Sequence, residues 1–405
     1  MGLIARLLGP DQILMPLRSV PGGMDTPVIV DAVRTPFGRQ DGVFRDTHPQ
    51  DLAAEPLRAL EARNDLDPAV VEDVVYGCVT PVEDQGWNVG RLAPMVAGWG
   101  DGVPGVQLNR MCGSGQQAAN FAAGQIAAGF HDVVVAGGVE HMTRVPMLSD
   151  GSGVTDTYFE HYEERTHQGE GAERIAEEYG FTREAMDEIA LDSQRRWAAA
   201  AEAGHHDDQV VPVEVEVDGE TEVVEADRHP RPDTDLETLG SLPLAFREAG
   251  EGLVHPGNSS GIVDGAAALL IASERAAAEH GWDPKLRILD STVVGVDPIT
   301  MLTGPIPATR EILERNDLAP GDVDRYEVNE AFAPVVAAWL EEIGADWDRV
   351  NVWGGAIAHG HPLGATGAAL LGKLPSQLEV CDGRYGLSAM CIGFGMGIAT
   401  LVERV

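Results

Sequence analysis

Cysteine is scarce in this chain of 405 residues, which holds four, and no two of them form a Cys-x-x-Cys pair. A large chain without paired cysteines is typical of a reducing compartment rather than of a secreted fold stapled by disulfides. Long apolar runs are missing as well, since no stretch approaches the roughly 18 consecutive apolar residues of a membrane span. We therefore expect a cytoplasmic protein with free thiols and no insertion into a membrane.

Positively charged residues are also few. The chain carries 28 basic against 65 acidic residues, which gives a formal net charge of −37, and lysine occurs only at Lys285 and Lys373. Such a charge repels nucleic acid, which we exclude as a partner. An acidic surface poor in lysine resembles that of proteins that work in molar salt, where the Debye length falls to about 3 Å and self-repulsion is screened. We hypothesise a halophilic source.

The first 23 residues stand apart from the rest. Arg6, Asp11 and Arg18 interrupt any apolar stretch that a signal peptide would need. Met24 is followed at once by the strand-like run 26–31. We interpret residues 1–23 either as sequence that precedes the natural start at Met24 or as a loosely held extension outside the fold.

Three zones follow. Residues 24–140 alternate β-branched strands with helices, the pattern of a mostly parallel sheet covered on both faces. Residues 141–256 change to charged helices, an acidic strand-like patch and a loop rich in Pro, Arg and Asp, which predicts an inserted subdomain. From 257 the α/β alternation returns. The expected strands are 28–30, 74–76, 106–108, 133–136, 210–217 and 326–328, and the expected helices are 51–62, 116–128, 171–179 and 182–203.

The last zone echoes the first. Residues 106–129 and 350–374 each consist of a strand, a glycine-rich turn and an alanine-rich helix, and 388–399 has a rough counterpart in 133–138. The similarity is weak in sequence, but it predicts a duplicated fold.

Cys112 lies where an apolar strand gives way to a glycine-lined helix start. Unpaired backbone N–H groups and the positive end of a helix dipole can lower the pKa of a thiol there and make it a nucleophile. The alternative is a small buried apolar cysteine, the commonest fate of a free thiol.

The run 354–367 is a long glycine turn that leads into a helix and carries His359 and His361. So much glycine costs chain entropy unless the backbone bends tightly or approaches a ligand. His361 could serve as a base there. The alternatives are a packing turn with exposed histidines, or a metal site, for which no further ligand spacing is present.

Three further segments stand out. Asn329 and Glu330 follow a strand and could orient water or a histidine, or simply cap a helix. Cys391 precedes a glycine turn whose backbone N–H groups, Gly393 included, could stabilise an oxyanion, or it is a buried thiol at a close sheet crossing. The run 257–261 is a loop that could be structural.

The Gly393–Gly397 run has no room for a dinucleotide-binding βα unit, and 354–367 lacks a P-loop ending. His205 and His206 lie among acidic residues, where we expect solvated surface.

These five segments, in this order, resemble the thiolase family, and the resemblance covers Thr26 to Val405. It implies a five-layered αβαβα core made of two similar halves with a loop domain inserted in the first, and a homodimer or homotetramer. On this basis 24–140 is the N-terminal half, 141–256 the loop domain, 257–284 the return to that half, and 285–405 the C-terminal half.

The resemblance also implies roles for individual residues. Cys112 matches the cysteine that is acylated, and His361 matches the histidine that activates it. Cys391 matches the thiol that exchanges a proton with the α-carbon of acetyl-CoA. Asn329 matches the residue that holds a water at the enolate oxygen, and the N–H groups of Cys112 and Gly393 match the acyl oxyanion hole. Acyl-CoA, acetyl-CoA and CoA are then substrates and products, and no bound cofactor or metal is expected.

On the substrate side, Arg231 matches the arginine near the adenine of CoA, and Phe246 and Ser260 match positions near pantetheine. Two residues depart from the pattern. Phe394 stands where many members have glycine, and Gln168 stands where enzymes dedicated to acetoacetyl-CoA often carry methionine. Gln168 therefore favours an enzyme that also accepts longer chains.

The sequence predicts an acetyl-CoA C-acyltransferase that works through an acyl-cysteine, with an acetoacetyl-CoA-specific biosynthetic thiolase as the alternative. Two rivals are weighed against it. Decarboxylating ketoacyl synthases need two catalytic histidines, or a histidine and an asparagine, where this chain has Asn329 and Cys391. A non-catalytic lipid carrier on the same scaffold can dispense with a catalytic residue. This chain has all four catalytic residues that the resemblance implies, Cys112, His361, Cys391 and Asn329.

Overall fold

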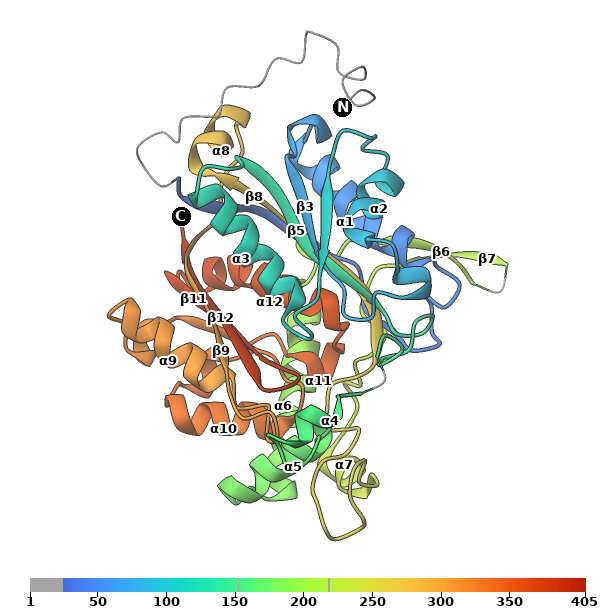
Figure 1. Cartoon of the computed structure of the whole chain (residues 1–405), viewed down its shortest axis with the longest axis vertical. Coiled ribbons are helices and arrows are strands. Elements are labelled where there is room, and N and C mark those ends of the chain that lie inside the picture. Colours follow the sequence, from blue (N-terminus) through green and yellow to red (C-terminus); the bar gives the residue numbers. More distant parts are fainter. Residues whose placement is uncertain (1–24, 152, 218) are drawn as a thin grey trace, which may run out of the picture.

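The computed structural model describes residues 25–151, 153–217 and 219–405, so the extension predicted at 1–23 lies outside the described residues. Its principal sheet has ten strands, nine of them in the order β10-β11-β12-β9-β1-β8-β5-β3-β4, with β2 paired to β8. Two residue pairs between β1 and β9 join what are otherwise two separate sheets. These two sheets are the cores of two halves of the chain, seen at the upper right and lower left of Figure 1.

The elements of the first half begin with the strand predicted at 28–30, and each of its predicted strands and helices is confirmed. They are β1 (Pro27–Arg34), β2 (Gly38–Arg39), α1 (Pro49–Asn64), β3 (Asp73–Gly77), α2 (Val89–Ala97), β4 (Gly105–Leu108), α3 (Ser114–Ala127), β5 (Val133–His141), and, after the insertion, β8 (Val263–Ser273) and α8 (Glu274–His280).

The second half contains four strands and four α-helices within the described part of the chain. They are β9 (Leu286–Gly295), α9 (Pro305–Arg315), β10 (Arg325–Val328), α10 (Ala333–Ile343), α11 (Ala356–His359), α12 (Leu363–Val380), β11 (Tyr385–Ile392) and β12 (Met396–Arg404).

The two halves share one pairing scheme, which explains the sequence echo. In the first half β3 runs parallel to β5, β5 antiparallel to β8, and β8 antiparallel to β1. In the second, β10 runs parallel to β11, β11 antiparallel to β12, and β12 antiparallel to β9. The strand expected at 350 is reduced to a single parallel bridge between Val350 and Tyr326, the counterpart of the β4–β3 pairing.

Five layers result. Helix α1 contacts the outer face of the first sheet, α3 and α12 lie between the two sheets, and α9 covers the outer face of the second, with α10 beside it (Figure 1). Strand β1 shows how the sequence builds these layers, because Val28 packs in the outer apolar cluster and Ile29 in the middle one. A bulge between Ile29 and Asp31 then shifts the alternation, so that Ala32 faces the middle layer and Val33 the outer one.

Glycine lets the two middle helices approach with their backbones almost in contact. A Cβ on Gly115 of α3 would lie 2.8 Å from the carbonyl oxygen of Gly364, and one on Gly367 of α12 would lie 2.3 Å from the amide nitrogen of Gln116. Any larger residue would therefore separate the helices. Because Cys112 precedes α3 and His361 precedes α12, this close packing also positions the two candidate catalytic turns.

The segment between β5 and β8 carries the charged helices predicted at 171–179 and 182–203, while only the second part of the predicted strand 210–217 is a strand. Its elements are α4 (Asp156–Phe159), α5 (Gln168–Tyr179), α6 (Arg183–Glu202), the hairpin β6 (Val213–Val217) with β7 (Glu220–Val224), and α7 (Leu236–Ser241). None of the helices in the described part of the chain combines the length and apolar character needed to cross a membrane.

One expectation for this segment is wrong. His206 is buried rather than solvated, with its ring stacked on Trp197 at 5.6 Å between centroids, and His205 stacks on Trp353 at 4.8 Å. The local sequence is acidic, but these tryptophans come from α6 and from the turn before α11, so the neighbouring residues gave no sign of the contact.

Candidate active site

Cys112 lies in a tight turn between β4 and α3. Met111 takes a left-handed conformation with φ of 45°. Ser114 fixes the turn, because its Oγ accepts a hydrogen bond from the amide of Arg110 at 2.8 Å and donates one to the carbonyl of Met111 at 2.6 Å. Cys112 is only 3% exposed and belongs to one apolar cluster with Leu363 and Ile392, which brings together the starts of α3 and α12 and the end of β11.

Three hydrogen bonds favour the thiolate of Cys112, yet burial outweighs them. The Nε2 atom of Gln168 lies 3.7 Å from Sγ, and the backbone N–H groups of Gly393 and of Cys112 itself also lower the pKa of the thiol. Burial is the largest influence and raises that pKa above its usual value. The direction is opposite to the lowered pKa expected from the helix start, so the resting thiol is protonated and needs a base.

Cys391 provides a second buried thiol near the first. It is the second-last residue of β11, is 1% exposed, and pairs with Gly397 of β12. Burial raises the pKa of Cys391 strongly, and the neighbouring Cys112 thiol raises it further. The turn that follows contains Phe394 with φ of 62°, and the ring of Phe394 is 44% exposed, so it points away from the packed core.

His361 is held as a neutral base. Its Nδ1 lies 2.6 Å from Thr366 Oγ1, and this hydroxyl donates its own proton to the carbonyl of Pro362 at 2.9 Å. The hydroxyl must therefore accept from Nδ1, which places the ring proton on Nδ1 and leaves Nε2 as a lone-pair acceptor. Burial lowers the pKa of His361 to about 4, so the base form is present at neutral pH.

Asn329 lies at the end of β10, and its Nδ2 is 3.3 Å from Nε2 of His361. It does not cap a helix, because α10 begins after Phe332. Its Oδ1 is buried and has no hydrogen-bond partner among the described residues. This oxygen is therefore available to a substrate group or a water next to the histidine.

The two histidines of the glycine turn are both buried, so the alternative of exposed histidines is wrong. His359 is 1% exposed, its Nδ1 lies 2.8 Å from the Gly360 carbonyl, and its ring meets Phe37 edge-on. Gly360 itself has φ of 93°. The run 354–367 thus combines tight turning with backbone packing and positions a base.

Two buried glutamates hold the site together, Glu330, which the sequence singled out beside Asn329, and Glu140, which it did not. Glu140, fully buried on β5, accepts hydrogen bonds from the amides of Val79, Thr80 and Gly364 at 2.9 to 3.1 Å. Glu330 accepts from Ser193 Oγ at 2.6 Å and from Asn351 Nδ2 at 2.9 Å. A glutamate inside an apolar strand, such as 133–141, is the available signal, although its partners are distant in sequence.

The substrate-side candidates lie along one side of these groups. Phe246 is 39% exposed and packs on Phe332 at 6.0 Å between ring centroids, and the amide of Ser260 donates to the carbonyl of Ala331 at 2.9 Å. Both are thus close in space to the Asn329 segment. Arg231 is exposed on the loop 227–235 and donates from Nη1 to the carbonyl of His229 at 3.0 Å.

The fold and this site define a class: an α/β enzyme of two similar halves, with two buried thiols and a neutral histidine where the halves meet. Two models of one enzyme family match the chain. "Thiolase, N-terminal domain" matches residues 27–275 and "Thiolase, C-terminal domain" matches residues 282–404. The chain belongs to the thiolase family, and it is an acyltransferase.

Individual relatives extend the match over nearly the whole chain. A steroid 3-ketoacyl-CoA thiolase of Mycobacterium tuberculosis is 44% identical over 93% of this chain and 94% of its own length. A 3-oxoadipyl-CoA/3-oxo-5,6-dehydrosuberyl-CoA thiolase of Escherichia coli is 41% identical over 93% and 99%. The crystal structure of the Bacillus anthracis acetyl-CoA acetyltransferase superposes with a TM-score of 0.87 at 37% identity, covering 95% of this chain and 100% of that one. The five-layered fold expected from the sequence is confirmed.

Proposed function

We propose that this thiolase cleaves 3-ketoacyl-CoA with CoA, and runs the reverse condensation with acetyl-CoA, through an acyl group carried on Cys112. The observation that carries the proposal is the pair of buried thiols, Cys112 and Cys391, which interact electrostatically and come from different halves of the fold. A nucleophile and a separate proton donor are what this carbon–carbon cleavage needs.

The first half-reaction uses the tautomer of His361. Its unprotonated Nε2 takes the proton of Cys112, and the sulfur attacks the ketone carbon of the substrate. The N–H groups of Cys112 and Gly393, which already face the sulfur, stabilise the oxyanion. The bond between C2 and C3 breaks, the leaving enolate takes a proton from Cys391, and acetyl-CoA departs from an acyl-Cys112.

The second half-reaction restores the enzyme. The Cys391 thiolate takes the proton of CoA, and the CoA sulfur attacks the acyl-Cys112 carbonyl. Cys112 leaves as thiolate and regains its proton from the protonated His361. Protons and bonds balance without a metal or a bound cofactor, and acyl-CoA is released. Asn329 supports the enolate step through its amide contact with His361 and its unpaired Oδ1.

We infer a substrate range that extends beyond acetoacetyl-CoA. A polar Gln168 touches the nucleophile in this chain, and two relatives are named for substrates with larger acyl groups. For the CoA nucleotide we propose Arg231. Partial burial, and then the nearby charge of Arg39, lower the pKa of its guanidinium, and the two arginines form a local concentration of positive charge on an acidic protein. Phe246 and Ser260 would face the pantetheine arm.

The direct test is a thiolysis assay on purified protein across a KCl series, with acetoacetyl-CoA and a longer 3-ketoacyl-CoA. We expect cleavage of both substrates and a rise in activity and stability with salt, because screening relieves the repulsion of a net charge of −37. Activity on acetoacetyl-CoA alone would point to the biosynthetic alternative. Full stability without salt would contradict a halophilic source, and no activity in folded protein would favour a non-catalytic carrier.

We further propose a cytoplasmic homodimer or homotetramer. Strand β4 is an edge of the sheet, and Val106 on it is 44% exposed. Trp87 nearby in the chain is 95% exposed, and Phe121 of α3 is 49% exposed. An apolar edge strand invites pairing with a second copy. Light scattering should therefore give at least twice the mass of one chain, and a Trp87→Asp variant should shift toward the monomer.

A further inference from the structure

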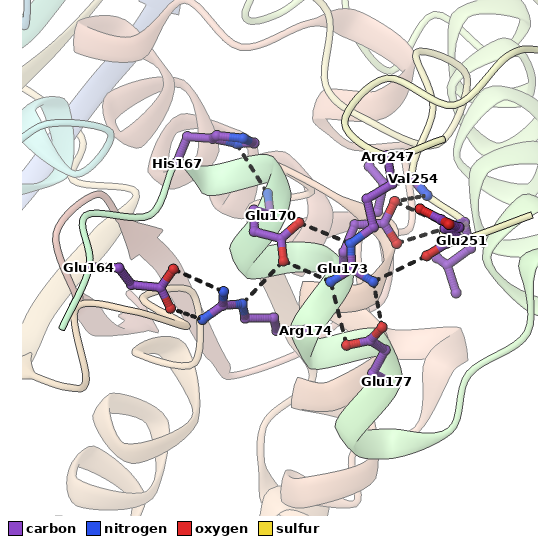
Figure 2. A network of polar contacts seen from close by, with 10 residues as sticks. Glu164, His167, Glu170, Glu173, Arg174, Glu177, Arg247, Glu251 and Val254 are labelled. Atoms are coloured by element: carbon purple, nitrogen blue, oxygen red, sulfur yellow. Dashed lines mark hydrogen bonds and ion pairs between the residues drawn. The ribbon is translucent and has the colours of Figure 1, made fainter. Parts of the chain in front are cut away.

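Helix α5 is connected to the segment 245–254 by a network of ion pairs and hydrogen bonds (Figure 2). Its centre is Arg247, whose guanidinium donates from Nε and Nη2 to the two oxygens of Glu170 at 2.9 and 2.7 Å. The same guanidinium bonds Glu177, two turns further along α5, through Nη1 and Nη2, and the carbonyl of Glu251 through Nη1 at 3.2 Å.

Arg247 uses its full donor capacity in these bonds. A guanidinium has five N–H groups in a fixed plane, and the five bonds to Glu170, Glu177 and Glu251 account for them. The side chain is only 16% exposed. Lysine could not span the same carboxylates, because its charge sits on a single nitrogen with three donors.

One further arginine reinforces Glu170, and a second glutamate of α5 connects it to the same segment. Arg174 bonds both Glu170 and Glu164, so Glu170 is shared between two arginines. Glu173, on the buried side of α5, accepts hydrogen bonds from the amides of Leu253 and Val254 at 2.9 Å each (Figure 2). The segment 245–254 is therefore fixed to α5 from two sides.

This junction lies directly beside the candidate nucleophile. Gln168, the first residue of α5, reaches Sγ of Cys112, and the imidazole of His167 caps the helix by accepting from the amide of Glu170 at 3.2 Å. Phe246, next to Arg247 in the chain, packs on the His167 ring at 5.3 Å between centroids. Its ring also covers Gly169 so closely that a Cβ there would lie 2.4 Å from it.

We infer that Arg247 is a positioning residue that determines acyl-group selectivity. Its hydrogen bonds to Glu170 and Glu177 of α5 fix the Phe246 ring over Gly169 and hold Gln168 next to the Cys112 thiol. The inference rests on the proposed role of Cys112 as the acylated nucleophile. A ring held in place limits the space beside the thiol, and a Gln168 amide held in place stabilises the thiolate.

Arg247→Met is the informative change, because it keeps an unbranched side chain and removes all five donors. We expect the ratio of kcat/KM for a longer 3-ketoacyl-CoA to that for acetoacetyl-CoA to rise about tenfold, as the freed ring admits the larger acyl group. We also expect alkylation of Cys112 by iodoacetamide at a fixed alkaline pH to slow by about threefold or more, because loss of the Gln168 hydrogen bond raises the pKa of the thiol.

Arg247→Lys keeps the charge without the fork and should behave like Arg247→Met. Arg275→Met is the matched control, since Arg275 on α8 pairs with Asp132 and Glu279 but is half-exposed and touches no site residue. It should leave both readouts at wild-type values. A selectivity ratio and an alkylation rate that stay at wild-type values in Arg247→Met, or a fully wild-type Arg247→Lys, would overturn the inference.

Phe246→Leu tests whether the change in selectivity comes from the Phe246 ring and not from a loss of stability in the Arg247 variants. It leaves the ion pairs intact and should shift the selectivity ratio in the same direction, at an unchanged melting temperature. An unchanged ratio there would overturn the claim that the ring limits the acyl group. If the wild-type protein forms no acyl-enzyme, the proposed function fails, while the alkylation rates of the Arg247 variants still decide whether Arg247 positions Gln168.

Discussion

Replacing Cys112 by alanine is expected to abolish thiolysis, with kcat reduced by roughly 10⁴-fold or more, the scale seen when a nucleophile is removed from a covalent enzyme. Cys391 cannot substitute, because it lies on β11, and burial and the Cys112 thiol both raise its pKa strongly. The measurement is steady-state thiolysis of acetoacetyl-CoA and of a longer 3-ketoacyl-CoA, with folding checked by thermal melting.

Cys381→Ala supplies the matched control. Cys381 ends α12 with its Sγ 3.6 Å from the carbonyl of Leu378, and it touches none of the site residues. It should retain wild-type kcat, so the loss in Cys112→Ala cannot be attributed to removal of a thiol as such. Measurable turnover in a folded Cys112→Ala protein, above a few per cent of wild type, would remove the covalent mechanism.

Cys391→Ala is expected to separate the two halves of the reaction. Acylation by acetyl-CoA uses Cys112 as nucleophile and His361 as base, and the CoA sulfur can leave as a thiolate without the proton of Cys391, because a thiol has a pKa of about 8.5. Acylation should therefore proceed within about tenfold of the wild-type rate. Condensation should fall by roughly 10³-fold, within the range of a lost general acid–base group. The physical reason is that condensation runs the cleavage step backwards, so Cys391 must take the α-proton of acetyl-CoA to form the enolate, and alanine cannot do this.

Two assays on the same Cys391→Ala preparation distinguish these steps. Rapid-quench trapping gives the rate at which the acetyl group reaches the protein, and product analysis gives the rate of acetoacetyl-CoA formation. Cys391→Ser offers a milder comparison, because a hydroxyl can partly replace the proton donor. Condensation at the wild-type rate in Cys391→Ala would exclude Cys391 from the mechanism, and loss of acylation would assign it a structural role instead.

Much of the fold could be predicted because its signals are local. β-branched runs predicted β1, β3 and β5, and the alanine-rich stretch after Cys112 predicted α3. The glycine turns at 354–367 and 393–397 predicted candidate site segments, because a backbone that bends tightly or packs closely requires glycine. Val350 shows the limit of such local signals: the strand expected there is a single bridge, since the next residues turn into the glycine run.

The remainder depends on contacts between distant segments, which one sequence does not reveal. The pKa of Cys112 is raised because burial by Leu363 and Ile392 outweighs the helix start. Glu140 and Gly364 meet across more than two hundred residues of chain. Arg247 shows no local pattern, yet its five bonds connect a loop to the helix that carries Gln168.

One measurement tests most directly whether Cys112 carries the acyl group. Wild-type protein is incubated in high KCl with acetyl-CoA, or with a 3-ketoacyl-CoA in the absence of free CoA, then quenched in acid and mapped by peptide mass spectrometry. We predict one acyl group per chain, on the peptide that contains Cys112, and its release on addition of CoA. An acyl group on Cys391 or on any other residue, or none in protein that turns over substrate, would contradict the account.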